Sequence, residues 1–347
     1  MGEFFTIRSK GDQFSLQFHK RSLYILISLM LVTFIVFLIS LSAGSSYIPL
    51  GAVFQELIGE SEHAFVLNEL RMPRVVMGFL VGAGLGVSGL ILQGMIRNPL
   101  GSPDIVGVTG GASVGAVLFI VFLLGEMSVN WLPLASIMGA AVTTAIIYLL
   151  SWKNGVTPMR LILIGIGISA LTNAIVTMFM VSSESAIASK VYLWLTGSLY
   201  GANWQEVTIL LPIILTLIFI SIFFTGVVDV KQLGDDVATG MGVRVQLFRF
   251  LLLALSVALA GAAVSFAGGI AFVGLIAPHI ARLILHNSFA NLVVGSALIG
   301  SLIVMGADII ARTAFLPSDI PAGVFTAGIG APFFIYLLYR NRKVMSE

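Results

Sequence analysis

The sequence predicts an all-α membrane protein that crosses the bilayer about ten times. Hydrophobic residues make up 58% of its 347 positions, charged residues only 10%, and its mean hydropathy is +1.05. About a quarter of the residues in a soluble domain are charged, so this chain has too few to cover a water-facing surface. Its apolar runs are continuous and about 20 residues long, which indicates spanning helices rather than the alternating strands of a barrel.

Composition also excludes several functional classes. The chain has no cysteine, which excludes disulfides, thiolate metal sites and thiol chemistry. Its net charge of +2 is too small to indicate a nucleic-acid partner. No cleavable signal peptide is expected, because the first apolar run is followed by further membrane segments. No G-x-x-x-x-G-K-[ST] loop occurs, so the chain is expected to bind no ATP in the P-loop manner and to be no enzyme.

The expected helices follow the apolar runs. They cover residues 23–43, 75–96, 106–125, 131–152, 158–181, 207–225, 247–267, 270–285, 290–314 and 322–339. The nearly unbroken run 247–285 is too long for one helix, because it would extend about 58 Å against a hydrocarbon core of about 30 Å. We expect the pair Gly268 and Gly269 to divide it, which leaves a short second segment.

Basic residues predict the orientation of these helices. With the N-terminus in the cytoplasm, 14 Lys and Arg residues fall inside and 4 outside, as the positive-inside rule requires. Both ends are basic, which needs an even number of crossings. We therefore expect a cytoplasmic segment 1–22, a ten-helix membrane domain 23–340 and a cytoplasmic tail 341–347. The four outside cations are Arg71, Arg74, Lys190 and Arg312.

A glycine motif lies in the second predicted helix. Residues 84–89 match G-x-G-x-x-G, but the dinucleotide fingerprint needs a preceding strand, and these residues lie within an apolar helix. Gly78, Gly82 and Gly86 recur every four residues, a spacing that lets membrane helices approach closely. Helix packing is therefore the favoured interpretation.

The polar segment 226–246 is the longest predicted cytoplasmic connection. Its stretch 236–242 begins with an acidic residue, which small or apolar residues and two glycines follow. The spacing alone leaves two alternatives open. The segment is either an ordinary solvated loop or a short helix–turn–helix that docks on a cytoplasmic partner.

Two further features are interpreted as structural. Residues 98–104 hold two prolines, which predicts a turn with Asn98 and Pro99 in it and Asp104 as the N-cap of the next helix. His279, beside Pro278, is interpreted as a structural histidine rather than a proton relay, and no second ligand is placed beside it for a metal site.

A polar face runs along the predicted helix 158–181. Its members recur at helical spacing and either bond a neighbouring helix or line a wet pathway. They are Ser169, Thr172, Asn173 and Thr177.

The outside arginines need an explanation of their own. Asp308 and Arg312 are four residues apart, so an ion pair on one helical face is expected, and a buried pair would be structural. Alternatively Arg312 faces the outer surface with Arg71 and Arg74, where the three cations bind an acidic partner.

Several segments together resemble the iron-siderophore and vitamin B12 permease family of ABC importers, the FecCD type. The resemblance covers nearly the whole chain after residue 22. It rests on 70–74, on 82–115 with the stretch 97–100, on 194–198, on 268–279, and on 307–312 followed by 330–332. The stretch 97–104 is most similar to permeases for ferric hydroxamate siderophores.

The resemblance implies a type II ABC importer permease in the bacterial cytoplasmic membrane. Two permease subunits, identical or homologous, would pair with two copies of a cytoplasmic ATPase, which would bind ATP and Mg, so this chain would carry no cofactor. An extracellular or periplasmic binding protein would dock on Arg71, Arg74 and Arg312. The ATPase coupling residues implied are Asp235, Asp236, Ala238 and Gly242.

The resemblance also implies a mechanism and a cargo. The helices 158–181 and 322–339 would reorient during ATP-driven alternating access and pass a ferric siderophore between the subunits. Vitamin B12, haem and catecholate relatives share the scaffold. An ion-coupled secondary transporter is less favoured, because such folds are commonly built from repeats and use ionisable groups at the midplane, neither of which is evident here. A membrane enzyme is disfavoured because no pair of catalytic groups converges.

Overall fold

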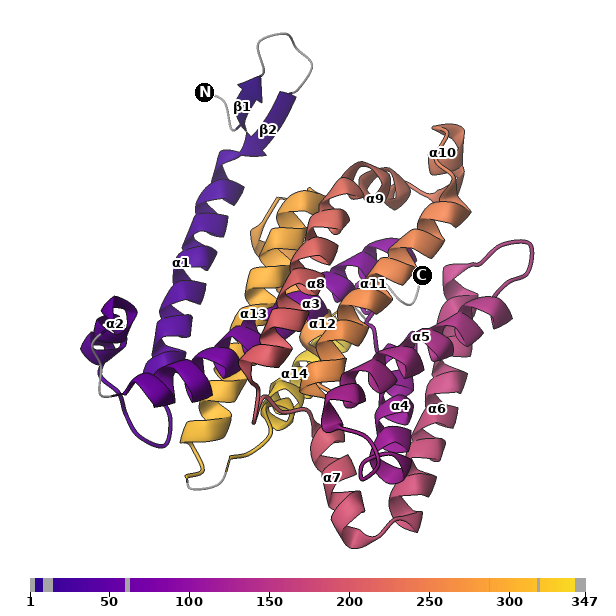
Figure 1. The fold of residues 1–347 in the computed structure, drawn as a ribbon. Coiled ribbons are helices and arrows are strands. Elements are labelled where there is room, and N and C mark those ends of the chain that lie inside the picture. The colour runs from indigo at the N-terminus through magenta and orange to yellow at the C-terminus, as the bar shows by residue number, and fades with distance from the viewer. Residues whose placement is uncertain (1–3, 9–14, 60–62, 287, 317–318, 341–347) are drawn as a thin grey trace.

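The computed structural model describes residues 4–8, 15–59, 63–286, 288–316 and 319–340. Helices dominate it, and a small antiparallel hairpin precedes them (Figure 1). Its elements are β1 (Phe4–Arg8), β2 (Ser15–His19), α1 (Lys20–Ser42), α2 (Leu50–Ile58), a π-helical turn (Val66–Arg71), α3 (Met72–Ile96), α4 (Val108–Phe122), a 3₁₀ turn (Val129–Trp131), α5 (Leu132–Leu150), α6 (Pro158–Ser182), α7 (Ser185–Thr196), α8 (Trp204–Phe223), α9 (Thr225–Gln232), α10 (Asp235–Gly240), α11 (Val245–Ala267), α12 (Val273–Ile284), α13 (Phe289–Thr313) and α14 (Ala322–Arg340).

Each of the ten predicted membrane helices has a counterpart among the described residues. Eight helices are long and apolar enough to span a bilayer, and α4 and α12 are shorter apolar helices. The break predicted at Gly268 and Gly269 is confirmed, since α11 ends at Ala267 and α12 begins at Val273. With 12 residues, α12 is about 18 Å long and does not cross the core by itself.

Two short helices and the hairpin were not predicted. The hairpin lies in the segment 1–22, which was expected to be cytoplasmic, and it pairs Phe4 with His19 through Arg8 with Ser15. The helices α2 and α7 have 9 and 12 residues, too few for the length of apolar run that marks a membrane helix. Tertiary packing rather than a long apolar run therefore decides these elements.

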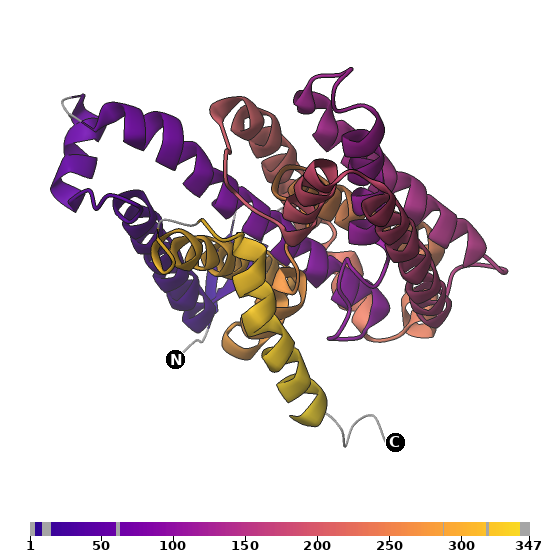
Figure 2. The same cartoon turned by 90° about the horizontal axis from the view of Figure 1, so that it is seen from below.

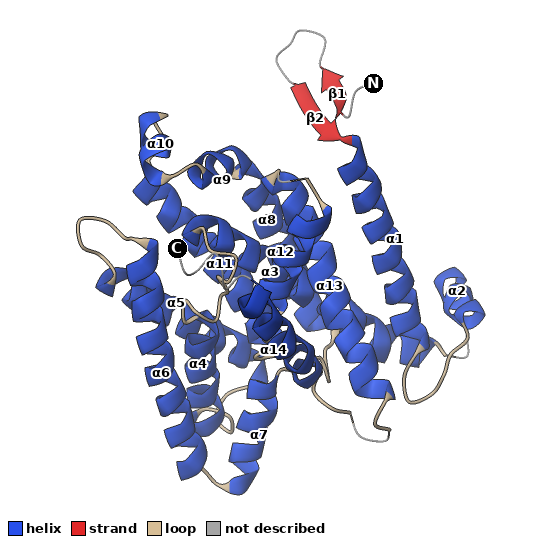
Figure 3. Ribbon diagram, turned by 180° about the vertical axis from the view of Figure 1, so that it is seen from behind, coloured by secondary structure: helices blue, strands red, loops and turns tan. Residues whose placement is uncertain are grey.

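The helices form two groups around a central one. Figures 1 and 2 agree that α1 and α2 lie on one side and α4 to α7 on the other. The almost fully buried α3 lies between them with α11, α12 and α13. We call the end that bears α9 and α10 the α10 end, and the opposite end the α7 end (Figures 1 and 3).

Small residues bring α3 against its neighbours. A Cβ atom placed on Gly82 would lie 2.3 Å from the carbonyl oxygen of Gly300 in α13, and one on Gly86 would lie 2.2 Å from that of Ser296. Such distances mean that the backbones touch. The packing interpretation of the glycine motif is therefore confirmed, and the close approach brings α3 to the centre of the bundle.

Candidate functional site

At the α10 end, the segment predicted as a partner-docking element is a pair of short helices. The helices α9 and α10 are joined through Leu233 and Gly234, and α10 is followed by Gly242 at φ 84°, a left-handed conformation that suits glycine. Of the two alternatives left open by the sequence, the helix–turn–helix is therefore the one adopted.

Asp235 anchors this helix pair to the bundle. Its carboxylate pairs with Arg249 of α11 at 2.5 Å and with Arg97, at the end of α3, at 3.6 Å. Ala238, one turn further, is fully buried. These two predicted coupling residues therefore hold α10 in place. Asp236 and Gly242 are exposed and line a groove of about 540 Å³.

The charges beneath α10 are unbalanced. Lys231 is buried, and desolvation, together with the nearby positive charge of Arg249, lowers its pKa to about 8. Asp235 opposes this shift and is the carboxylate that faces the Lys231, Arg249 and Arg97 cations. An excess of buried positive charge makes the position of this carboxylate energetically important.

A chain of contacts connects α10 to the beginning of α6. Arg249, paired with Asp235, also donates a hydrogen bond to the carbonyl oxygen of Val156. Gln246 accepts one from the Val156 backbone N–H at 3.0 Å. Val156 lies two residues before α6 begins at Pro158. These contacts therefore join α10 to the segment that precedes α6.

Three apolar side chains of the helix pair and its end are exposed. Leu233, Val237 and Met241 are 66%, 47% and 63% exposed, and they recur every four residues. We call these three residues the apolar tip. Exposed apolar side chains that cluster beside charged residues are typical of a protein-binding surface.

The predicted polar face of α6 is partly internal and partly exposed. Thr172 is buried and donates to the Ser169 carbonyl oxygen at 2.9 Å, and Thr177 donates to that of Asn173 at 2.8 Å. Asn173 and Thr177 are exposed on this chain. A polar side chain on a spanning helix faces protein or water rather than lipid, so this face needs a partner subunit or a wet space beside it.

The predicted cap of α4 is wrong. The N-cap of α4 is Gly107, with no side-chain cap hydrogen bond, because the chain makes additional turns after Pro103. Asp104 lies three residues earlier and accepts a hydrogen bond from the Thr109 hydroxyl. Asn98 does form the predicted turn, since its side-chain oxygen accepts the Leu100 N–H at 2.9 Å.

The remaining structural candidates lie in α12. Pro278 is buried within the helix. The His279 ring packs edge-on against Phe333 of α14, with ring centroids 5.7 Å apart. This contact agrees with the structural interpretation of the histidine.

At the α7 end, Asp308 lies between two arginines. Its side chain, 2% exposed, pairs with Arg74 at 2.8 Å and with Arg312 at 3.3 Å. Arg74 also forms a bidentate ion pair with Asp319, with nitrogen–oxygen distances of 2.6 and 2.9 Å. Its guanidinium lies 5.9 Å from the Tyr200 ring centroid. The expected pair of Asp308 and Arg312 is confirmed as a buried one.

Two of the outside arginines also cap the C-terminal end of α1 with hydrogen bonds. Arg71 donates to the carbonyl oxygens of Leu41 and Ser42 at 2.7 and 2.8 Å, and Arg312 donates to Ser40 Oγ at 2.6 Å. The last carbonyls of a helix lack partners within it and attract cations. Arg71 and Arg312 are buried and Arg74 is nearly so, so the chain itself engages all three. Their binding of an external partner stays a prediction.

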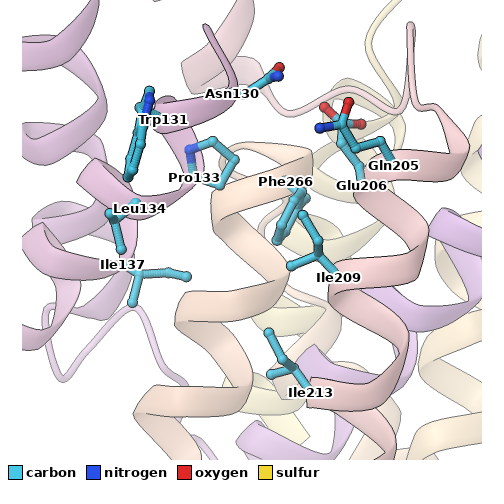
Figure 4. Close-up of a pocket in the computed structure, with 10 residues that line it drawn as sticks. All are labelled: Asn130, Trp131, Pro133, Leu134, Ile137, Gln205, Glu206, Ile209, Ile213 and Phe266. Atoms are coloured by element: carbon cyan, nitrogen blue, oxygen red, sulfur yellow. The ribbon is translucent and has the colours of Figure 1, made fainter. Parts of the chain in front are cut away.

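A separate cavity lies between α5 and α8 (Figure 4). It has a volume of about 310 Å³ and apolar walls that include Trp131, Ile209 and Phe266, with Gln205 and Glu206 together at one edge. None of the predicted pathway residues lines it. The cavity is therefore distinct from the polar face of α6.

Comparisons with known proteins agree on one class. The FecCD transport family model matches residues 31–340. The chain is 44% identical, over 93% of its length and 96% of the relative, to the Probable siderophore transport system permease protein YfhA of Bacillus subtilis. It is 41% identical, over 90% of its length and 96% of the relative, to the Iron(3+)-hydroxamate import system permease protein FhuG of the same organism. A solved metal-chelate type ABC transporter in an inward-facing conformation matches with a TM-score of 0.80 at 31% identity, covering 92% of this chain and 99% of that one.

Proposed function

We propose that the cargo of this chain is a ferric hydroxamate siderophore and that ATP drives its transport by alternating access. The chain belongs to the FecCD transport family. It is a multi-pass permease subunit of an ABC importer for iron-siderophore or related substrates. The similarity to a hydroxamate permease over nine tenths of the chain supports the cargo. The chelator already fills the coordination sphere of the iron, so no residue of this chain needs to bind the metal.

We propose that the α10 end lies in the cytoplasm with both termini. Connecting segments that carry basic residues meet at this end of the bundle, and their contacts support the orientation. Ser22, at the start of α1, bonds the backbone of His286 at 3.0 Å, and Arg97 and Arg249 converge on Asp235. Positive residues concentrate on the cytoplasmic side of membrane proteins.

The proposed assembly pairs this chain with a second permease, identical or homologous, and with two copies of an ATPase that binds ATP and Mg. The exposed polar residues Asn173 and Thr177 support a partner or a wet space beside α6. The apolar tip supports ATPase docking, because an exposed apolar cluster on a water-facing connection is buried by a partner at a gain in free energy.

Contacts within the α10 end support a route for coupling. When the ATPase dimer closes, it would push on the apolar tip and displace α10. The pair of Asp235 with Arg249, and the bond from Arg249 to Val156, would carry that displacement to the start of α6. Because α6 carries the exposed polar face, its movement would open the path to one side.

We propose that a binding protein docks at the α7 end. Arg74 is the outside arginine with the most exposed side chain, and it is held at the surface by Asp319 and Tyr200. An acidic residue of a docking protein would compete with Asp319 for Arg74. Arg71 and Arg312 would act less directly, by keeping the end of α1 and the surface around Arg74 in place.

Charges on the apolar tip are expected to prevent ATPase assembly. Val237→Asp and Met241→Asp each place a carboxylate in the proposed contact, so co-purification of the ATPase with the permease should fall about tenfold or more, as for a lost interface hot spot. Val129→Asp, an equal change at an exposed site of the α7 end, should leave it unchanged. Normal ATPase recovery with both tip variants would refute docking at this surface.

Arg249→Lys is expected to uncouple ATP hydrolysis from transport while leaving assembly intact. Lysine keeps the charge beside Asp235 but lacks the planar fork that reaches both Asp235 and Val156. Uptake per ATP hydrolysed should fall about tenfold, within the usual range of coupling free energies. Lys20→Gln, at an exposed position of the same end, serves as the control. An unchanged ratio of uptake to hydrolysis would contradict the proposed route.

A further inference from the structure

We propose that Asp104 lines the transport pathway at mid-membrane depth and selects the cargo by charge, favouring neutral and cationic ferric chelates over anionic ones. The proposal rests on the proposed function, because it needs a pathway beside α6. It gives a role to a carboxylate that does not cap α4.

The depth of Asp104 follows from its neighbour on α6. Ser169 Oγ donates to the Asp104 carbonyl oxygen at 3.4 Å, and Ser169 lies near the middle of the 25-residue α6. At 1.5 Å per residue it is about 16 Å from the start of the helix, halfway through a hydrocarbon core of about 30 Å. Asp104 therefore lies close to the bilayer midplane.

The backbone around Asp104 indicates a wet environment. The chain leaves α3 at Ile96 near the α10 end and returns to the midplane before α4 begins at Val108. Non-helical backbone at membrane depth occurs only where protein buries it or where it lines a water-filled cavity. Asp104 is exposed on this chain, and a carboxylate facing lipid at this depth is strongly unfavourable. Its exposed side therefore faces water, polar cargo or a second permease subunit rather than lipid, and thiol labelling distinguishes a wet surface from a buried one.

The neighbours of Asp104 make a polar surface. The Thr109 hydroxyl bonds one carboxylate oxygen, which orients the side chain. Asn173 lies one helical turn beyond Ser169 on the same face of α6 and is exposed. Asp104 thus extends the predicted polar face of α6 by a charged group from a different segment.

No described part of α4, α6 or the 97–107 connection supplies a cation at this depth. Arg160, in the first turn of α6, donates to the carbonyl oxygens of Ser151 and Lys153 at 3.2 Å, so its charge stays at the α10 end. Arg97 pairs with Asp235 at the same end. Asp104 is therefore the charged side chain that these three segments place at this depth. A charge acts more strongly in a narrow pathway than in bulk water, because the effective dielectric constant is lower.

The first test uses chelates that differ only in charge. Ferrioxamine B carries one free ammonium group, its N-acetyl derivative is neutral, and its N-succinyl derivative is anionic, all around the same ferric hydroxamate core. Uptake by the complete transporter, normalised to the affinity of the binding protein for each chelate, should favour the cationic over the anionic form by about threefold or more. Asp104→Asn should remove this preference and Asp104→Lys should reverse it. Glu126→Gln, at an exposed site beyond the end of α4, should preserve it.

The second test measures the position of the side chain and needs no transport. The chain has no cysteine, so a single cysteine can be labelled by a charged, membrane-impermeant thiosulfonate in the assembled transporter. Asp104→Cys and Asn173→Cys should react in at least one nucleotide state, while the buried Ser88→Cys should not. Failure of Asp104→Cys to react in every state would overturn the pathway assignment.

The outcomes separate the two proposals. If the wild type transports none of the three chelates, the hydroxamate cargo is wrong, and labelling still decides whether Asp104 lines the pathway. If the wild type transports them and Asp104→Asn leaves the charge preference unchanged, charge selection by Asp104 is wrong and the hydroxamate cargo stands. Loss of the preference in Asp104→Asn, with labelling of Asp104→Cys, supports both.

Discussion

Asp308→Asn is expected to destabilise the permease by about 3–5 kcal/mol, the usual cost of removing one partner from a buried ion pair. Asp308 neutralises Arg74 and Arg312, and both lie within 3.3 Å of its carboxylate. Arg74 keeps Asp319 after the change. Arg312 would be left as a buried cation without a carboxylate. Unfolding of the purified chain by denaturant or heat in detergent measures the loss.

A matched variant separates burial from charge. Asp319 also pairs with Arg74, but its side chain is more exposed, so Asp319→Asn should cost only about 1 kcal/mol or less. Removing both charges, in Asp308→Asn with Arg312→Gln, should recover part of the loss, since the uncompensated cation is gone. Equal stabilities for Asp308→Asn and Asp319→Asn would show that the network does not hold this end together.

The same variants test whether the binding protein uses Arg74. If an acidic residue of that protein competes with Asp319, Asp319→Asn should tighten its binding to the permease. Arg74→Gln should weaken it. If both variants bind as the wild type does, the arginines of the α7 end serve only the fold of this chain.

Gly82→Ala is expected to destabilise the permease about as much as Asp308→Asn does. The expected loss of about 3 kcal/mol or more lies at the upper end of overpacking costs. The added carbon would lie 2.3 Å from the Gly300 carbonyl oxygen and 2.6 Å from the Ser301 Cα. Both are backbone atoms of α13, so no side-chain rotation can relieve the clash. The helices α3 and α13 must separate, which should be measurable as a lower unfolding temperature and a loss of assembled transporter.

Gly306→Ala provides the control within α13. A Cβ atom at Gly306 would meet nothing within 4 Å, and alanine is the better helix former by about 1 kcal/mol. This variant should be as stable as the wild type or slightly more so. If Gly82→Ala behaved in the same way, close backbone contact would not be what positions α3.

Local sequence was sufficient to predict the features that depend on a short stretch of chain. The ten membrane helices follow from apolar runs and the length that a bilayer requires. The division at Gly268 and Gly269 follows from a run too long for one helix. The stripe through Gly82 and Gly86 needed only helical periodicity. The short α2 and α7 escaped prediction, because no apolar run long enough for a membrane span marks either.

The partners of the candidate functional residues depend on the tertiary structure. Arg74 and Asp308 are 234 residues apart in the sequence, and Asp235 meets Arg97 from a different segment. No spacing rule connects such positions, so the sequence predicted the Asp308–Arg312 pair from their spacing but left open whether Arg312 faces the outer surface with Arg71 and Arg74. The structure engages them with Asp308, Asp319 and the end of α1, and their binding of an outside partner stays a prediction.

By itself, therefore, the sequence determined an all-α membrane protein of about ten crossings, because hydrophobic length and periodicity are local properties. Only the tertiary structure decided which charges are satisfied within the chain and which remain exposed. Asp104 is the clearest case. Its sequence context indicated a helix cap, whereas the path of residues 97–107 brings it beside Ser169 in the middle of α6. The difference arises because depth in the membrane is set by the packing of distant helices.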